Sequence, residues 1–447
     1  MGSNGGGGSA PPVTSALGAA AARGSLRWAI VCLALLIAAI AYLDRSNIAI
    51  AASFLKRDLA LSDVQLGVVF SAFVLGYAVA QPFAGRCADR YGPYRVIAIG
   101  MLSWSVLTAL TASIPASFPQ AFMLLLAVRF ILGLGESVIF PASNRLIANW
   151  VPSTERGLAN GLLFAGVGLG AGTAPPLITF LMLGYGWRAA FWASAGLGLA
   201  GLTAWLLIAR DLPERHAWIG QTELDYIVDG RSNAVSGASD LASWREIIGN
   251  PQVLLLTLSY FCFGYVGYIF FTWFFTYMST VRGLDLRSTG IYGMLPFIAM
   301  ALASPLGGFV SDRLTRRFGR RIGRCRLAVA AMASAAMFVA AATQVQDARL
   351  ATVVLAAGSG SLYFSISCFW ALSADIGRDS AGAVAGVINM GGQLGGTVVA
   401  TLTPILAHHI GWSGSFLIAA AVALFGGGIW LFIDPTVNLY AGRLPKP

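Results

Sequence analysis

The sequence predicts an all-α membrane protein with about twelve transmembrane helices, arranged as two pseudo-symmetric halves of six helices each. The composition supports a membrane location, because 57% of the 447 residues are hydrophobic and only 11% are charged. The mean hydropathy is +0.73, whereas a soluble chain carries about 25% charged residues. At about 20 apolar residues per span, with short loops between spans, the chain has room for about twelve helices.

The apolar runs divide the chain into two halves. The first half is expected over residues 26–210, with spans at about residues 28–54, 64–85, 96–113, 121–147, from Gly157 past Pro176, and 188–208. The second half is expected over residues 251–434, with spans at about residues 253–278, 291–310, 327–342, 350–372, 383–407 and 416–433. A polar middle loop, residues 211–250, separates the halves, and residues 243–248 within it predict a short surface helix. Residues 1–25 predict a disordered tail, since they are mostly Gly, Ala, Ser and Pro with almost no charge, and residues 435–447 form a second tail.

Two sequence markers occur once in each half at nearly the same interval. Asp89-Arg90 closes the second span and Asp312-Arg313 closes the eighth, 223 positions later (312 − 89). Gly157-x-x-x-Gly161 opens the fifth span and Gly382-x-x-x-Gly386 opens the eleventh, 225 positions later (382 − 157). Two markers with nearly one offset are typical of membrane folds built from two parallel repeats.

The arginine-rich loops predict the orientation and account for the net charge of +10. The loops after the second and eighth spans hold many of the arginines, and the positive-inside rule places such loops in the cytoplasm. Both termini are therefore expected to be cytoplasmic, and no nucleic-acid partner is expected. The five cysteines and three histidines show neither disulfide nor metal-ligand spacing. No P-loop or other catalytic motif occurs, so we expect no enzyme activity. We also expect no metal, and we expect the protein to be a monomer.

Four charged residues inside the first and fourth spans carry the strongest functional signal. Asp44 and Arg45 lie within the first span, and Arg129 and Glu136 lie seven residues apart in the fourth. That spacing places the second pair on one helix face, about 10 Å apart along the axis. Each charge costs roughly 2.5–3.5 kcal/mol in a bilayer, so such residues indicate function by default. Two interpretations remain open: ion pairs that only join helices, or groups that bind a proton and an anion.

The second half offers neutral groups where the first half offers charges. We place no charge at mid-depth there, but find these rings and polar groups: Tyr265, Tyr268, Trp273, Ser367, Trp370, Asn389 and Gln393. This asymmetry predicts that the first half handles protons and an anion's charge, while the second supplies hydrogen bonds and ring faces to a polyol or similar body. Asn389 with Gln393, and Tyr77 with Gln81 in the second span, either line the same cavity or make helix-packing contacts.

Asp89 and Asp312 are expected to act in gating. Each lies at the inner end of a helix, beside Arg90 and Arg313 respectively. Such carboxylates can form charge pairs that are made in one conformation and broken in the other. The alternative is that these residues only signal membrane topology.

Several motifs resemble those of known transporters. Gly85-x-x-x-Asp89-Arg90-x-Gly92-x-x-Arg95 resembles the signature loop of the major facilitator superfamily, and Gly308-x-x-x-Asp312-Arg313 resembles its second-half echo. Tyr42-Leu43-Asp44-Arg45-Ser46-Asn47 is similar to the first-helix motif of the anion:cation symporter family, which includes bacterial sugar-acid carriers, sialin and vesicular glutamate carriers. The segments Asn149-Trp150-Val151-Pro152 and Phe270-Phe271-Thr272-Trp273 match that family too.

The resemblance implies a major facilitator fold in the bacterial inner membrane and proton-coupled uptake of an organic anion by alternating access, with no cofactor besides the coupling proton. By likeness, Asp44 and Glu136 would be the proton-coupling acids, Arg45 would hold the substrate carboxylate, and Arg129 would couple the acids to the substrate. Five further residues match positions that line the cavity of sugar-acid carriers: Tyr42, Tyr77, Ser367, Trp370 and Asn389. Val167 stands where some of those carriers have a glutamine, a departure that bears on the substrate.

The expected substrate is a sugar acid, such as an aldonate, aldarate or hexuronate, or a related carboxylate. Two alternatives remain beside proton symport. The first has the same fold but a different direction of transport: an exporter or exchanger of organic anions. The second is a membrane sensor that binds an anion without moving it, which the lack of an attached signalling domain disfavours.

Overall fold

The computed structural model describes residues 25–116, 118, 120–231, 241–284 and 291–440, and within them the regular structure is helical, with no strand. Residues 1–24 of the predicted tail and residues 441–447 of the second tail lie outside the described residues, as do residues 232–240 of the middle loop. The predicted all-α membrane fold is confirmed. By length and composition, ten helical stretches of the described residues can cross a bilayer.

The first half of the chain contains six spans and one short extra helix. Its helices are α2 (Leu26–Ile50), α3 (Ala52–Asp58), α4 (Asp63–Tyr91), α5 (Pro93–Ser113), α6 (Ala121–Glu136), α7 (Ile139–Trp150), α8 (Arg156–Tyr185) and α9 (Trp187–Ile208). The short helix α3 covers the end of the first predicted span and part of the connection to the second, and it was not predicted. Helices α6 and α7 together form one membrane span, Ala121–Trp150.

The second half begins with α12 (Pro251–Thr272), α13 (Phe274–Thr276) and a π-helical turn, Tyr277–Val281. It continues with α15 (Leu295–Phe318), a second π-helical segment (Arg321–Arg326), α16 (Leu327–Ala342), α17 (Ala348–Phe364), α18 (Ile366–Gly377), a 3₁₀ turn (Arg378–Ser380) and α19 (Ala381–Ile429). The last membrane stretch, Ala348–Ile429, holds 82 residues. At 1.5 Å per residue it would extend for about 120 Å, so it crosses a bilayer core of about 30 Å more than once. Gly411 (φ +76°) reverses the direction of α19.

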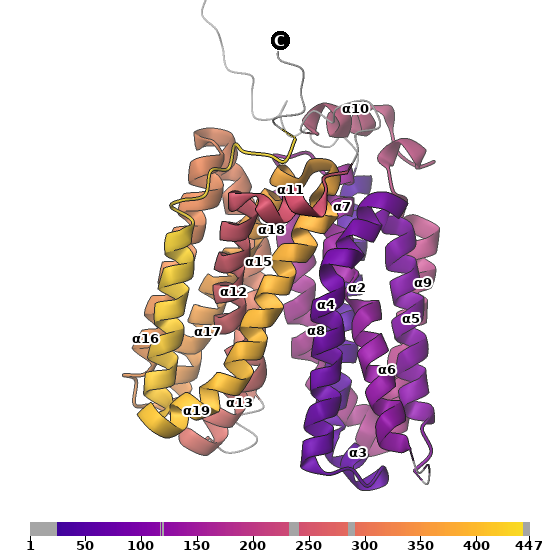
Figure 1. Ribbon diagram of the computed structural model, residues 1–447, viewed down its shortest axis with the longest axis vertical. Helices are drawn as coiled ribbons and strands as arrows, with labels where there is room; N and C mark the ends of the chain where they lie inside the picture. Colours follow the sequence, from indigo (N-terminus) through magenta and orange to yellow (C-terminus); the bar gives the residue numbers. More distant parts are fainter. Residues whose placement is uncertain (1–24, 117, 119, 232–240, 285–290, 441–447) are drawn as a thin grey trace, which may run out of the picture.

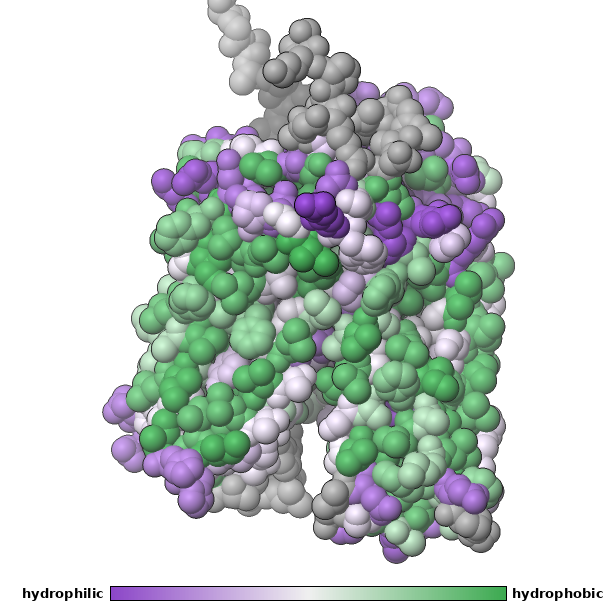
Figure 2. Space-filling model, viewed as in Figure 1, coloured by the Kyte–Doolittle hydropathy of each residue, from purple (hydrophilic) through white to green (hydrophobic). Residues whose placement is uncertain are grey.

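The helices form two bundles that lie side by side. Figure 1 shows α2, α4, α5, α6 and α9 on one side and α12, α16, α17 and α19 on the other. The short helices α10 (Gln221–Gly230) and α11 (Trp244–Gly249) cover one end of the molecule. Figure 2 shows apolar side chains over the outer faces of both bundles and hydrophilic side chains gathered at the ends, as expected for a protein surrounded by lipid.

The polar turns predicted after the second and eighth spans are helical instead. Helix α4 continues to Tyr91, and α15 continues to Phe318, so Asp89 and Asp312 lie within helices. Gly92, with φ +91°, ends α4 in a conformation that favours glycine. The predicted surface helix at residues 243–248 is confirmed as α11. A capping box formed by Ser243 and Glu246 stabilises its N-terminus. Helix α10 was not predicted.

Helix α10 is attached to the first half through a buried carboxylate. The backbone N–H groups of Leu26 and Arg27 both donate to the Glu223 carboxylate at 3.1 Å. The Arg27 guanidinium pairs with Glu223 at 3.0 Å and with Glu155 at 3.0 Å. These contacts satisfy the free N–H groups at the start of α2 and place the middle segment at the same end of the molecule as the start of the first span.

Glycines bring the two halves into backbone contact at two related places. A Cβ atom added at Gly85 of α4 would overlap the carbonyl oxygen of Gly382 at the start of α19. A Cβ atom added at Gly308 of α15 would likewise overlap the carbonyl oxygen of Gly157 at the start of α8. These are the glycine positions of the repeated markers and their partners, so the repeat in the sequence places small residues where helices of opposite halves cross.

Candidate functional site

Helix α2 presents two different faces at the motif Tyr42–Asn47. Tyr42, Arg45, Ser46 and Ala49 line a central cavity. Asp44 is rotated away from that cavity, because successive residues of an α-helix are about 100° apart. The adjacent acid and base of the sequence motif therefore act in different surroundings.

Asp44 is buried among helices α2, α5 and α9. Its carboxylate accepts hydrogen bonds from Thr108 Oγ1 at 2.7 Å and from Asn47 Nδ2 at 3.2 Å. Asn47 also donates to Ser194 Oγ at 2.6 Å. The side chain of Asp44 makes no ion pair with any described residue and does not line the cavity.

Arg45 and Glu136 form the ion pair of the central region. Nη2 and Nε of Arg45 donate to Oε2 of Glu136 at 3.0 and 3.3 Å. The Glu136 side chain is fully buried, whereas 17% of the Arg45 side chain is exposed. The guanidinium lies 4.4 Å from the ring centroid of Tyr77 and 4.6 Å from that of Tyr42. The geometry holds Arg45 between a buried carboxylate and the cavity.

Arg129 lies on the same face of α6 as Glu136, as predicted from their spacing, but outside the cavity lining. Its guanidinium carbon lies 4.6 Å from the ring centroid of Phe73, and its Nε has no partner among the described residues. The Phe73 ring centroid also lies 5.1 Å from the guanidinium carbon of Arg45, so both cations lie against the same ring. A buried guanidinium with an unused donor is costly unless a further group compensates it.

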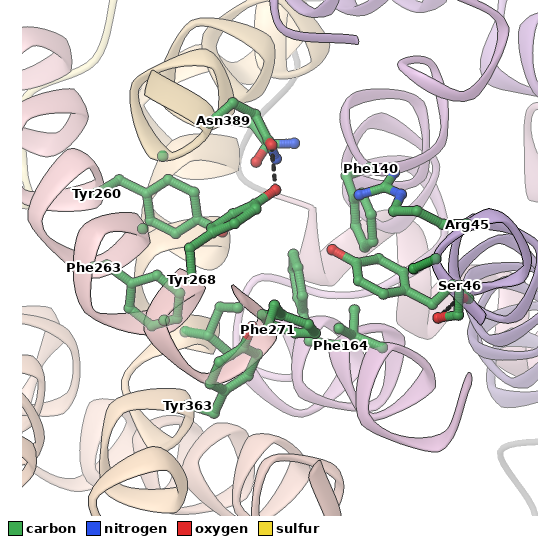
Figure 3. A pocket seen from close by; sticks show the side chains of 18 residues that line it. Arg45, Ser46, Phe140, Phe164, Tyr260, Phe263, Tyr268, Phe271, Tyr363 and Asn389 are labelled. Atoms are coloured by element: carbon green, nitrogen blue, oxygen red, sulfur yellow. Dashed lines mark hydrogen bonds between the residues drawn. The ribbon is translucent and has the colours of Figure 1, made fainter. Parts of the chain in front are cut away.

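The central cavity has a volume of about 210 Å³ and lies between the two halves. Eight aromatic residues line it: Tyr42, Phe140, Phe164, Tyr260, Phe263, Tyr268, Phe271 and Tyr363. Figure 3 shows Arg45 and Ser46 on one side of the open space and Asn389 with Tyr268 on the other. Arg45 is the one charged residue among the described residues that line it.

The second half contributes amides and hydroxyls to this cavity. The Tyr268 hydroxyl donates to the Gln393 side-chain oxygen, and the Tyr260 hydroxyl accepts a hydrogen bond from Trp370 Nε1 at 3.1 Å. Asn389 Nδ2 is buried and has no partner among the described residues. This amide is therefore a donor available to a ligand.

The residues that match cavity positions of sugar-acid carriers fall into two groups: some line the central cavity, and the others lie outside its lining. Tyr42, Arg45 and Asn389 line the cavity, whereas Tyr77, Ser367 and Trp370 do not. Trp370 supports the lining, since its ring centroid lies 4.9 Å from that of Phe164 and its indole N–H holds Tyr260. Tyr77 and Ser367 are buried, and their hydroxyl oxygens have no partner among the described residues.

Most of the aromatic lining was missed in the sequence. One face of α12 provides the lining residues at three- and four-residue spacing: Tyr260, Phe263, Gly264, Gly267, Tyr268 and Phe271. This alternation of rings and glycines at helical period was present in the sequence. It went unnoticed because aromatic residues in an apolar span also suit lipid contact or a packed core.

The end of the molecule beside α10 and α11 is closed by two related contacts. Asp89 of α4 accepts from the backbone N–H groups of Gly382 and Ala383 at 2.9 and 2.8 Å. Asp312 of α15 accepts from those of Gly157 and Leu158 at 2.9 and 2.7 Å. Each carboxylate thus lies at the N-terminus of a helix of the opposite half, where the helix dipole favours a negative charge.

The arginine partners of these carboxylates differ from the neighbours in the sequence. Arg145 lies 3.9 Å from Asp89, and Arg324 lies 2.8 Å from Asp312. Arg90 and Arg313 are exposed and make no ion pair with any described residue. In Figure 2 the halves meet at this end and are separated by a gap at the opposite edge.

Two packed helical halves with a cavity between them and closure at one end are the architecture of a membrane transporter built from two repeats. The family model of the Major Facilitator Superfamily matches residues 34–400, and the chain belongs to this superfamily. The superfamily resemblance noted in the sequence is confirmed, and the relatives found are transporters, not enzymes.

Among curated relatives, the probable sulfoacetate transporter SauU from Cupriavidus necator is 31% identical over 402 residues, which cover 90% of this chain and 92% of the relative. The hexuronate transporter of Bacillus subtilis is 28% identical over 407 residues, covering 90% and 93%. Among solved structures, the proton:xylose symporter XylE superposes with a TM-score of 0.71 at 16% identity, covering 92% of this chain and 96% of that one. This structural likeness shows the fold alone.

Proposed function

We propose that the protein is a proton-coupled symporter of an organic anion, with a sugar acid or a related carboxylate as substrate. The observation that carries the proposal is the placement of Arg45, which is paired with the buried Glu136 and also lines the central cavity. A guanidinium offers a planar fork of donors that matches a carboxylate. An anion in the cavity would therefore compete with Glu136 for the same group.

This competition supplies a coupling mechanism. Protonation of Glu136 removes the negative charge that holds Arg45, and Arg45 becomes available to the substrate carboxylate. By linkage, a bound substrate anion then favours proton binding by the same factor. Asp44, whose hydrogen-bond partners are the neutral side chains of Thr108 and Asn47, is proposed as a second proton site, and Arg129 is proposed to couple the two acids.

The opposite wall is proposed to bind the uncharged body of the substrate. Asn389 supplies a free amide donor, and Tyr268 with Gln393 supplies a hydrogen-bonded pair. Sugar rings and hydrocarbon segments can both lie against the aromatic rings of α12. The relatives named for hexuronate and sulfoacetate are both transporters of anions, which supports an anionic substrate and leaves open whether it is an aldonate, aldarate, hexuronate or smaller carboxylate.

Alternating access is proposed to depend on the contacts at the closed end. Asp89 and Asp312 would release the N-termini of α19 and α8 when that end opens, with Arg90 and Arg313 available as alternative partners. We further propose that the closed end faces the cytoplasm of a bacterium, with both termini on that side, and that a monomer is the functional unit.

Uptake of radiolabelled glucuronate, galactarate and gluconate into proteoliposomes, with and without an inward proton gradient, tests the proposal. The expected result is accumulation of at least one of these anions that requires the gradient. Equal flux with and without the gradient would favour an exchanger or exporter and contradict symport. Binding of an anion without flux would favour a sensor.

A further inference from the structure

A second cavity lies at the closed end of the molecule, separate from the central cavity. Its volume is about 140 Å³, and both halves contribute to it. The first half provides residues of α7 and the start of α8, while the second provides the end of α18 and the 3₁₀ turn that follows it. The lining residues are Arg145, Ala148, Asn149, Arg156, Leu212, Arg231, Ala374, Arg378 and Asp379.

Four of the lining residues are arginines, and one is an acid, Asp379. Arg156 pairs with Asp375 at 2.7 Å, and Arg231 pairs with Glu214 at 2.6 Å. These two acids are not among the residues that line the cavity. Like charges gathered in one small cavity repel one another, and this repulsion is stronger where water is partly excluded.

The other two arginines are incompletely compensated. Arg145 lies 3.7 Å from Asp379 and 3.9 Å from Asp89, distances beyond a normal hydrogen bond. Arg378 makes no ion pair with any described residue, although its carbonyl oxygen accepts from Arg145 Nη1 at 2.7 Å.

Two buried donors of this cavity have no partner. The Nε atoms of Arg156 and Arg378 are both buried and unpaired among the described residues, and the whole Arg156 residue is only 3% exposed. Leaving a buried donor unpaired costs about 1–3 kcal/mol, and more for a charged group. The lining itself thus holds four arginines against one carboxylate, with unpaired donors on two of the arginines and room for several water-sized groups. Three of the arginines are partly offset by acids outside the lining: Asp375, Glu214 and Asp89.

The backbone at Arg378 is also unusual. Its φ of +45° is one of two positive values at non-glycine residues of the described chain. For a residue with a Cβ atom, this backbone conformation costs of order 1–3 kcal/mol, and it persists only where contacts with the surrounding residues stabilise it. Arg378, in the turn after α18, lines the cavity together with Arg145 and Arg156.

We propose that this closed-end cavity is a binding site for a phosphate group. A tetrahedral phosphate group offers acceptors in several directions to the arginines that both halves contribute to the lining, and arginine is well suited to bidentate phosphate contacts. Because Arg145 and Arg156 belong to one half and Arg378 to the other, a bound phosphate stabilises the closed end. Phosphate in this site therefore holds the transporter open at the opposite end. The site does not depend on the nature of the transported anion.

The melting temperature of the purified full-length protein in detergent tests the proposal. Two sources of the phosphate group are compared: inorganic phosphate, with ionic strength matched by chloride, and phosphatidylglycerol added to the micelles. One or both are expected to raise the melting temperature of the wild type by at least about 2 °C, since a ligand that binds only the folded state stabilises it. The source that acts identifies the ligand.

The matched variants are Arg378→Gly, which removes the guanidinium and relaxes the positive φ, and Arg316→Gln, which removes an exposed arginine of α15 outside the cavity. Arg378→Gly is expected to lose the shift, and Arg316→Gln to keep it. An equal shift in Arg378→Gly, or no shift of the wild type with either source, would overturn the proposal.

Hydrogen–deuterium exchange tests the bridging role directly. The phosphate source that acts should slow exchange in residues 145–158 of the first half and in residues 374–383 of the second half together. Protection of only one of these segments would contradict a site shared between the halves, even if phosphate binds.

Discussion

The two walls of the central cavity differ in chemistry although they belong to related halves. The wall from the first half contains Arg45, with Glu136 buried behind it. The wall from the second half contains rings, hydroxyls and the amides of Asn389 and Gln393, and none of its described lining residues is charged. One wall therefore offers a charged group that can pair with an ionised substrate, and we propose that its acid carries a proton. The other wall offers only shape and neutral hydrogen-bonding groups.

The closed end shows the opposite behaviour, because the two halves there are nearly equivalent. Asp89 binds the N-terminus of α19 and Asp312 binds the N-terminus of α8, with backbone contacts of the same kind and similar length. The repeat is retained at the closed end, where we propose that the halves move against each other and where a symmetric closure needs the same contact twice. It has diverged in the central cavity, where we propose that an organic anion, itself asymmetric, binds.

The strongest test of this comparison is removal of the titratable group from the charged wall. Glu136→Gln keeps a carbonyl oxygen that can accept a hydrogen bond from Arg45. The guanidinium is partly exposed and also lines the cavity, so its charge is not left buried without a partner, and we expect the fold to be retained. We expect gradient-driven accumulation to be abolished while exchange of substrate across the membrane continues. Counterflow and gradient-driven uptake in the same proteoliposomes measure the two activities.

Asp44→Asn is the companion variant, because it retains an acceptor for Thr108 or Asn47. The same loss of accumulation is expected if Asp44 also carries a transported proton. Normal accumulation in both variants would contradict a proton role for either acid. Loss in Glu136→Gln alone would restrict coupling to the Arg45–Glu136 pair.

A smaller effect is expected when the fork of Arg45 is replaced by a single ammonium group. Arg45→Lys keeps the charge but cannot donate two parallel hydrogen bonds to a carboxylate. Hydrogen bonds to charged groups contribute about 1.5–3 kcal/mol, so substrate affinity should fall roughly ten- to a hundredfold. Equilibrium binding of the transported anion measures this loss, with Arg316→Gln as the control; unchanged affinity would point to Arg129 as the anion-binding group.

The sequence was sufficient for the fold because each span carries its own apolar run. The repeat of Asp89-Arg90 and Gly157-x-x-x-Gly161 also correctly indicated two related halves, because close helix crossings require small residues at fixed places. The ends of the helices were harder to predict from the sequence. Helix α4 extends past Gly85 through Tyr91, since polar residues at the membrane surface continue a helix as readily as they end it.

Residues of the candidate site were predicted most clearly where a charged side chain lies within a membrane span. Arg45 and Glu136 were recognised from their charge, and the structure joins them at 3.0 Å. The direction of Asp44 could not be read from its adjacency to Arg45, because its partner Thr108 comes from a helix distant in the sequence. The aromatic lining left a pattern of rings and glycines in α12, but a packed core or lipid contact explains such a pattern equally well. The closed-end cavity depends on contacts between the halves, which no local pattern specifies.

The smallest predicted effect concerns the neutral wall. Asn389→Ala removes a buried amide whose Nδ2 is free for a ligand, and a neutral hydrogen bond contributes about 0.5–1.5 kcal/mol. The KM for uptake should therefore rise about two- to tenfold, while the dependence on the proton gradient stays as in the wild type. Gln344→Ala, at an exposed amide distant from the cavity lining, is the matched control. Loss of gradient dependence in Asn389→Ala would contradict the division between a charged, proton-coupled wall and a neutral one.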